Sequence, residues 1–150
     1  MMELLAPAGS LEALKTAVLY GADAVYVGGE MYGLRAKAKN FDESQLAEGV
    51  AFAHAHGVRV HVTVNIIAHN QHLDGLKEYL LFLQDVGVDA LIMADAGMIS
   101  IAREVVPEME IHLSTQASAT NYATFNFWHK QGVKRIVAAR EVSLAEMKEI

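Results

Sequence analysis

Two short apolar stretches of the sequence carry a polar residue at every second position. Residues 60–65 read Val-His-Val-Thr-Val-Asn, and residues 111–116 read Ile-His-Leu-Ser-Thr-Gln. Successive side chains of a β-strand point to opposite faces, so each stretch predicts a strand with one apolar and one polar face. His112 and Ser114 then share a polar face, where they could act in a hydrolysis together with Glu141, which follows a later strand.

The same residues also have a structural interpretation. Inward-facing histidines such as His61 and His112 are more often hydrogen-bonded interior residues than catalysts. Ser114 lies within a strand pattern and not in the Gly-x-Ser-x-Gly turn of serine hydrolases, which weakens the case for a nucleophile. His112, Ser114 and Glu141 are therefore catalytic candidates for which the structural alternative stays open.

A second group of polar residues follows or ends the predicted strands. Ligands of parallel α/β sheets gather beyond the carboxyl ends of the strands. The predicted substrate-binding residues are Glu30, Arg35, Lys37, Lys39, Asn65, Asp95, Gln116 and Arg140. Arg35, Lys37 and Lys39 alternate, so in an extended segment they would point the same way, either to grip a phosphate or RNA backbone or as a solvated loop face.

The carboxylates and the paired histidines allow more than one role. Asp95 and Glu141, at strand ends, could form an acid–base pair, although pairing with the arginines of the binding set is favoured. His69 and His72 are spaced to share a metal ion if that segment is helical. Because no acidic neighbour except Asp74 supports such a site, no metal is predicted.

Glycines divide the chain into repeated units. Four helix-like stretches end at a glycine that precedes a short run rich in Val and Ile, at Gly21, Gly57, Gly87 and Gly132. Glycine accepts the left-handed conformation that closes a helix, and short apolar runs are typical of buried strands. Two further strands, at residues 2–6 and 111–114, complete a β-α order repeated six times, which requires a parallel sheet.

The polar strand faces favour a barrel over an open sheet covered by helices on both sides. In a barrel one strand face meets the helices and the other lines an interior that becomes polar towards the mouth. We therefore predict an α/β fold: residues 1–150 form a single parallel (β/α) TIM-barrel-like domain. A complete barrel needs about 250 residues, and the last predicted helix runs from Ser143 to Ile150 without a C-cap. The expected domain is incomplete, with about six of eight β-α units, and is truncated at its C-terminal end.

An incomplete barrel leaves two strand edges without partners. The first and sixth predicted strands are apolar at residues 2–6 and 136–139, with neither Lys nor Pro to discourage edge pairing. This pattern predicts a homo-oligomer formed through the exposed strand edges.

Composition limits the remaining possibilities. The chain has 12 basic and 18 acidic residues, a net charge of −6, which disfavours a general nucleic-acid wrapper but permits a local basic patch. It contains no cysteine, so a disulfide, an iron–sulfur cluster ligated by this chain and a thiol nucleophile are excluded. The acidic start and the lack of any run of about 18 apolar residues predict no signal peptide, no membrane span and a cytoplasmic location.

Several motifs, in this order, resemble the N-terminal part of peptidase family U32, the collagenase-like proteins. They are residues 3–10 (Glu-Leu-Leu-Ala-Pro-Ala-Gly-Ser), 21–26, 33–37 with 40–41, 62–65, 112–118 (His-Leu-Ser-Thr-Gln-Ala-Ser) and 139–141. The resemblance covers essentially all 150 residues. It implies either protease activity, reported for some members, or a role in hydroxylating tRNA or ribosomal RNA or in oxygen-independent ubiquinone synthesis. In those modifying relatives, cysteines beyond the sixth strand hold a four-iron cluster, so a cluster is expected only in longer relatives.

Three function classes follow from the residues and the resemblance. The main prediction is a peptidase that acts on a peptide through His112, Ser114 and Glu141. The first alternative is the substrate-side part of a cluster-dependent RNA- or quinone-modifying enzyme, which would bind through Arg35, Lys37, Lys39 and Arg140. The second alternative is a catalytically inactive folding fragment. No cofactor is expected in this chain, and its expected substrates are a peptide or RNA.

Overall fold

The computed structural model describes residues 2–33 and 40–150. These residues form a six-stranded sheet in which neighbouring strands are parallel and follow sequence order. The strands are β1 (Leu5–Pro7), β2 (Ala24–Gly28), β3 (Arg59–Val64), β4 (Ala90–Met93), β5 (Glu110–Leu113) and β6 (Arg135–Ile136). The predicted strand order is thus confirmed.

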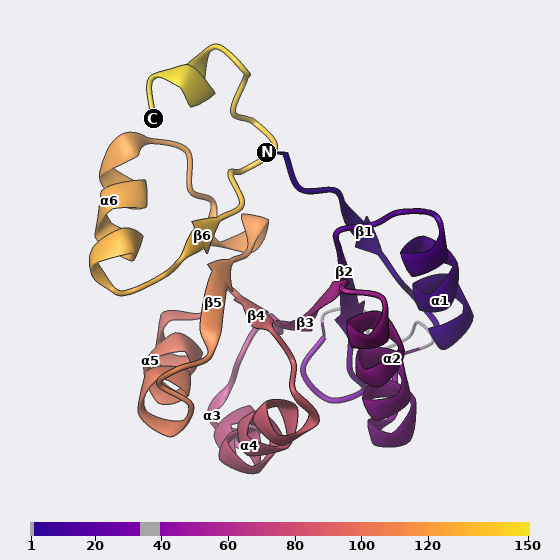
Figure 1. The fold of residues 1–150 in the computed structure, drawn as a ribbon. Coiled ribbons are helices and arrows are strands. Elements are labelled where there is room, and N and C mark those ends of the chain that lie inside the picture. The colour runs from indigo at the N-terminus through magenta and orange to yellow at the C-terminus, as the bar shows by residue number, and fades with distance from the viewer. Residues whose placement is uncertain (1, 34–39) are drawn as a thin grey trace.

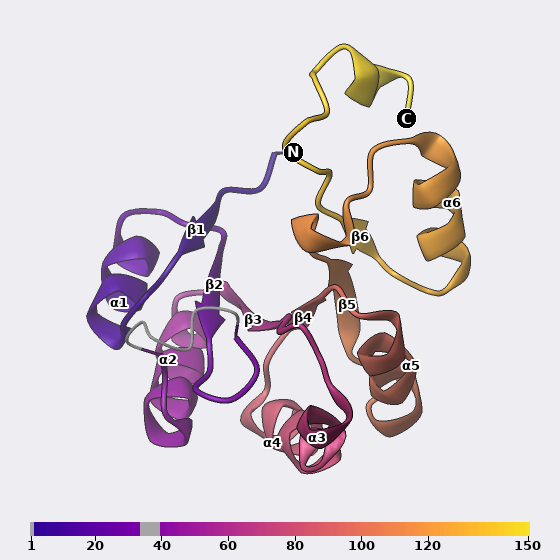
Figure 2. The same cartoon turned by 180° about the vertical axis from the view of Figure 1, so that it is seen from behind.

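Helices connect the strands and lie around the outside of the curled sheet (Figures 1 and 2). They are α1 (Leu11–Leu19), α2 (Glu43–Ala55), α3 (Asn70–Leu73), α4 (Leu76–Val86), α5 (Ala96–Val105) and α6 (Tyr122–Lys130), with short 3-10 turns η1 (Thr115–Ala117) and η2 (Glu146–Lys148). The sheet therefore forms an incomplete barrel, as the polar strand faces predict. None of the helices in the described ranges is long and apolar enough to cross a bilayer.

The main core lies between the sheet and its helices. Along β3, Val60, Val62 and Val64 are fully buried in this core, while His61 and Thr63 occupy the alternate face. The register pairs His61 with Ala90 and Thr63 with Ile92 on β4. The period-two pattern of the sequence therefore separates helix-facing valines from barrel-facing polar groups.

Side chains that precede the helices cap their first turns. Ser10 Oγ accepts a hydrogen bond from the Ala13 amide (3.1 Å), and Asp42 with Gln45 forms the predicted capping box of α2. Asp95 Oδ1 accepts from the Met98 amide at 2.8 Å and caps α5. These caps fix where each helix starts after its strand.

The predicted helix from Ser143 to Ile150 is wrong, because the structure holds only the 3-10 turn η2 there. The capping contact itself forms: the Ser143 amide donates to Glu146 Oε2 at 2.8 Å. Leu144 is 85% exposed and Met147 is 40% exposed, so the segment has no apolar face packed on a core. Short helices gain most of their stability from such packing, which explains why a cap alone does not extend the turn.

Candidate functional site

A cavity of about 550 Å³ opens at the carboxyl ends of the strands. Its wall includes Pro7 at the end of β1, Gly28 at the end of β2, Asn65 after β3 and Ser114 after β5. Arg140 completes the wall on the side of β6. Binding sites of parallel α/β barrels occupy this end of the sheet, so we call this space the mouth cavity.

Neutral polar groups dominate the hydrogen-bonding chemistry of the mouth cavity. Hydroxyl and amide side chains line it, namely Asn40, Thr63, Asn65, Ser114, Thr115 and Gln116. Among the described lining residues, Arg140 is the only Lys, Arg, His, Asp or Glu. A ligand of the mouth cavity therefore meets neutral donors and acceptors over most of its surface and a positive charge at one place.

Gly28, at the end of β2, lies beside two polar side chains of the mouth cavity. A Cβ atom at Gly28 would lie 3.4 Å from both Asn40 Oδ1 and Thr63 Oγ1. Thr63 Oγ1 donates a hydrogen bond to the Val27 carbonyl at 3.2 Å, which fixes its side chain against β2. A Cβ atom at Gly28 would therefore be in ordinary van der Waals contact with two polar side chains, one from the loop before α2 and one from β3.

The position of Arg140 is set by the backbone that follows β6. The Val137 amide donates to the Leu113 carbonyl and the Ala139 amide donates to the Ala119 carbonyl, each at 3.0 Å. These bonds tie the segment before Arg140 to the end of β5 and the loop after it. Within the described part of the chain, Arg140 forms no ion pair, so the predicted pairing with Asp95 or Glu141 is not found.

The structure brings together four of the predicted site residues at the mouth cavity. They are Asn65, Ser114, Gln116 and Arg140. Ser114 is buried, donates to Gln116 Oε1 and accepts from the Gln116 amide, both at 3.4 Å. Gln116 and Arg140 are exposed, so the polar lining runs from a buried serine to an accessible rim.

Three other predicted residues lie away from the mouth cavity. Glu30 lines a separate cavity of about 110 Å³ together with Phe41 and Tyr79. Asp95 caps α5, and Glu141 is exposed without lining the mouth cavity. Arg35, Lys37 and Lys39 lie outside the described residues.

His112 lies within the barrel interior and is not part of the mouth cavity lining. Its Nε2 pairs with Glu110 Oε1 at 3.1 Å, and the ring lies edge-on to His61 with centroids 4.7 Å apart. Burial lowers the pKa of His112, although the hydrogen bond that its ring donates to the Glu110 carboxylate partly opposes that effect. Among the described residues, no hydrogen bond joins His112 to Ser114 or either of them to Glu141.

His61 is the most strongly perturbed histidine of the interior. It is completely buried, and within the described part of the molecule neither ring nitrogen has a hydrogen-bond partner. The pKa of His61 is lowered to about 4, first by burial and then, to a smaller extent, by His112, Arg135 and Arg59 in that order. The ring is therefore neutral at pH 7, and the pair His61–His112 is a buried neutral layer beneath the mouth cavity.

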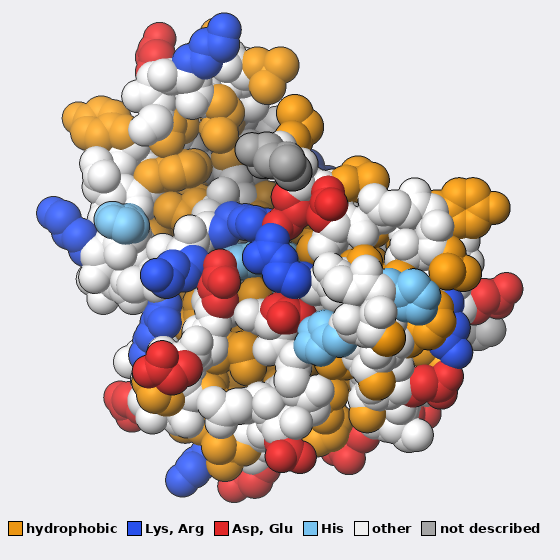
Figure 3. Space-filling view, in the orientation of Figure 1, with side chains coloured by type: hydrophobic (Ala, Val, Ile, Leu, Met, Phe, Trp, Pro, Cys, Tyr) orange, Lys and Arg blue, Asp and Glu red, His pale blue; other side chains and the backbone are white. Residues whose placement is uncertain are grey.

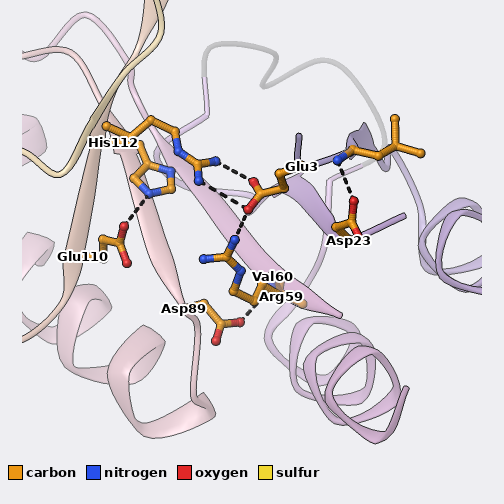
Figure 4. Close-up of polar contacts among 9 residues, drawn as sticks. Glu3, Asp23, Arg59, Val60, Asp89, Glu110 and His112 are labelled. Carbon is orange, nitrogen blue, oxygen red and sulfur yellow. Dashed lines mark hydrogen bonds and ion pairs between the residues drawn. The ribbon is translucent and has the colours of Figure 1, made fainter. Parts of the chain in front are cut away.

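The opposite end of the barrel carries a cluster of charged groups that we call the lower ion cluster: Glu3, Arg59 and Arg135. Figure 3 shows basic and acidic side chains side by side at the centre of this face, and Figure 4 shows the contacts. Arg135 Nη1 donates to Glu3 Oε1 at 2.5 Å, and Arg59 Nη2 contacts Glu3 Oε2. The Glu3 carboxylate thereby joins the chain before β1 to the first residues of β3 and β6.

Sequence reasoning missed several of these contributors. Tyr26 and Thr63 line the mouth cavity, and both follow the period-two pattern of strands that the sequence already indicates. Extending that pattern by one step towards the strand starts would have placed Arg59 and Glu110 on the inner face as well. Asn40 was not detectable in this way, because it reaches the cavity from the loop before α2 and not from a strand.

The residues of this chain do not form a site for the metal group that the resemblance implies. Within the described ranges, no three His, Asp or Glu side chains are arranged to hold a metal ion. The whole sequence has no cysteine, so thiolate ligands for an iron–sulfur cluster would have to come from outside these 150 residues.

Comparison with protein families identifies a match over most of the chain. The model described as peptidase family U32 matches residues 9–150. The tRNA hydroxylation protein P1 of Bacillus subtilis is 51% identical over 148 residues, covering 99% of this chain and 35% of that protein. The tRNA hydroxylation protein P of Escherichia coli is 47% identical, covering 99% of this chain and 33% of that protein. The chain thus spans about a third of the length of these curated relatives.

A solved structure supports the architecture. The U32 peptidase Mk0906 superposes with a TM-score of 0.75 at 17% sequence identity, covering 92% of this chain and 58% of that one. At this identity the likeness shows the fold alone. It confirms that the curled six-stranded sheet is a TIM-barrel-like arrangement.

Proposed function

Because this chain belongs to peptidase family U32, and its relatives at 47–51% identity are named for tRNA hydroxylation, we propose that it serves RNA hydroxylation as the substrate-binding part of such an enzyme. The observation that carries the proposal is the similarity to those relatives over 99% of this chain. The RNA-modifying alternative is therefore better supported than the peptidase prediction.

The mouth cavity is consistent with this proposal. Proteins recognise RNA sequence mainly at unpaired bases, which they contact through hydrogen bonds and stacking. The neutral amide and hydroxyl lining of the mouth cavity supplies hydrogen-bonding groups for a base. Arg140, the one arginine among the described lining residues, supplies a partner for a phosphate. A tRNA-directed role also agrees with the cytoplasmic location that we propose.

The geometry gives less support to proteolysis. A serine nucleophile needs a base within hydrogen-bond reach, and a histidine base is usually oriented by a third group. Here the histidine ring is bonded to Glu110, and Ser114 is bonded to Gln116. The catalytic roles predicted for His112, Ser114 and Glu141 are not part of the proposed function.

A chimaeric enzyme tests the proposed function. The segment of B. subtilis tRNA hydroxylation protein P1 that matches this chain is replaced by the present 150 residues, and the chimaera is expressed in a strain lacking tRNA hydroxylation. We expect hydroxylated nucleosides to reappear in tRNA digests analysed by mass spectrometry. A chimaera that accumulates to the level of the parent enzyme but leaves tRNA unmodified would contradict the proposal.

We also propose that the isolated chain self-associates through the sheet margins. β1 and β6 each pair on one side only within the described residues, and Leu4 and Val137 beside them are 58% and 37% exposed. Unpaired strand edges with neighbouring apolar side chains favour pairing with another chain.

A further inference from the structure

The mouth cavity changes in chemistry from its interior to its rim. Ser114 and Ile92 are buried within it, with exposed fractions of 5% and 9%. The cationic Arg140 and the amide of Gln116 lie at exposed positions. A ligand that fits this gradient has a neutral hydrogen-bonding part that enters first and an anionic group that stays near the rim.

One aromatic side chain offers a stacking surface within the same cavity. Tyr26 lines the mouth cavity and is 36% exposed, and β2 pairing places it beside Pro7 and His61. Stacking of a base on an aromatic side chain is worth about 1–3 kcal/mol per base and does not depend on base identity. Tyr26 thus adds an interaction that planar heterocycles gain and that aliphatic peptide side chains do not.

The size of the mouth cavity is suitable for one nucleotide. Its volume of about 550 Å³ falls in the range of roughly 300–1,000 Å³ that is usual for small-molecule sites. Among its described lining residues no carboxylate is present to repel a phosphate. Enzymes that modify a base within RNA take it out of the stack and hold it in a closely fitting pocket.

We propose that the mouth cavity seats a single unstacked nucleotide of an RNA strand, with its base between Tyr26 and the amides of Asn65 and Gln116 and its phosphate at Arg140. This inference rests on the proposed function and adds the binding site and the orientation of the nucleotide. The amides can donate and accept hydrogen bonds, as the edge of a pyrimidine requires. The base points inward because the interior is neutral, and the phosphate points outward because Arg140, the one cation among the described lining residues, lies at the rim.

Calorimetric titration of the chain with cytidine 5′-monophosphate, cytidine and inorganic phosphate tests this arrangement. Arg140→Gln should weaken binding of the monophosphate at least about tenfold, since it removes a charge-assisted contact, and should leave cytidine binding unchanged. Tyr26→Leu should weaken both the monophosphate and cytidine about tenfold, because both contain the base. Lys130→Gln, which removes an exposed cation on α6 away from the cavity, is the matched control and should change neither.

Several outcomes would overturn the inference. Equal monophosphate affinity for wild type and Arg140→Gln would remove the phosphate site, and no binding up to about 10 mM would remove the nucleotide site. Unchanged cytidine affinity in Tyr26→Leu would remove the stacking contact. Spectra of the backbone amides, compared between each variant and wild type, identify any variant that fails to fold. Tyr26→Phe, which retains the aromatic ring, should bind both ligands as wild type does.

The source of the nucleotide is tested by competition with the single-stranded trinucleotide CpCpC. If the mouth cavity takes a nucleotide from a strand, CpCpC should displace the monophosphate, and failure to displace it would overturn the inference in favour of a free nucleotide. The chimaera tests the proposed function separately from the binding site. A chimaera without tRNA hydroxylation whose mouth cavity still binds as described contradicts only the function, whereas an active chimaera with unchanged binding in Arg140→Gln contradicts only the site.

Discussion

The central strands and the margins of the sheet are built very differently. β3 pairs with both neighbours over four to five residues, whereas β6 pairs with β5 over two residues and β1 pairs with β2 over three. The helix α4 buries four of its side chains, while α6, all of which is described, buries none. Hydrophobic side chains gather on the surface over α6 and the C-terminal segment (Figure 3).

Because of this difference, the two parts of the mouth cavity are supported by regions of different stability. The apolar core between β2–β5 and helices α2, α4 and α5 holds the carboxyl ends of the central strands, and with them Asn65 and Ser114. Arg140 instead depends on the margin, since it follows β6. The mouth cavity therefore combines a rigidly supported neutral part with a charged part on the segment that follows a weakly supported strand.

A matched pair of leucine substitutions gives the largest expected effect. Leu80 on α4 is fully buried, and Leu144 is 85% exposed. Leu80→Ala should lower the free energy of unfolding by about 2–5 kcal/mol, because it removes buried methyl groups and leaves a cavity. Leu144→Ala should change it by less than about 0.5 kcal/mol. Urea denaturation measures both, and similar losses for the two variants would show that the margin is packed as firmly as the centre.

The next effect concerns the histidine layer of the central sheet. The folded-state pKa of His61 is about 4, below the usual value of 6.5, so the unfolded state binds the proton first as the pH falls. Stability is therefore complete above pH 6.5 and is lost as the pH falls towards 4. Between pH 7.5 and pH 5 wild type should lose about 2 kcal/mol more than His61→Leu, which cannot take up this proton.

Urea denaturation of both proteins at several pH values measures this difference. Thr63→Val on the same strand contains no titratable group in either form, so its difference from wild type should not vary with pH. A constant difference between wild type and His61→Leu would mean that the buried ring does not resist protonation.

The sequence predicts those parts of the site that follow the strand period. Alternation along residues 60–65 and 111–114 correctly places His61 and His112 inside, and puts Asn65 and Ser114 at the mouth. Gln116 also lines the mouth cavity, but from the 3-10 turn η1 and not from a continued strand. Local sequence patterns do not show whether a carboxylate at a strand end belongs to a site or caps the next helix. Asp95 ends a strand, as a site residue would, but the next helix takes its oxygen as a cap.

Contacts between distant segments were also beyond the local pattern. Glu3 and Arg135 are 132 residues apart in sequence, and their ion pair depends on how far the sheet curls. The repeated β-α order predicts a barrel but not that curvature. The predicted C-terminal helix shows the same limit, because a capping motif is local whereas the packing that would support a helix is not.

A charge on the last strand should weaken the proposed self-association. If the edges of β1 and β6 pair with another chain, light scattering should give a mass above the 16.3 kDa of one chain, increasing with concentration. Ile136→Lys replaces the apolar residue of the two-residue strand β6 by a charged one and should weaken association about tenfold. Lys134→Gln just before β6 is the control and should not weaken it. A stable monomer for the wild-type chain would refute self-association and leave the margin uncovered.

The smallest expected effect tests how the margin is held to the centre. Glu3 is 18% exposed and pairs with Arg135 at the start of β6 and with Arg59 at the start of β3. Partly exposed ion pairs contribute at most about 1 kcal/mol, so Glu3→Gln should speed hydrogen exchange of the Val137 amide about fivefold. The Ser114 amide, bonded to the β4 carbonyl of Met93, should be unaffected. Lys15→Gln, which breaks a surface pair between α1 and α2, should change neither amide. Faster exchange at both amides in Glu3→Gln would instead show that the lower ion cluster stabilises the whole sheet. No change at either amide would show that β6 is held without the cluster, by its backbone hydrogen bonds and by Arg103, which donates to the Gly132 carbonyl before the strand.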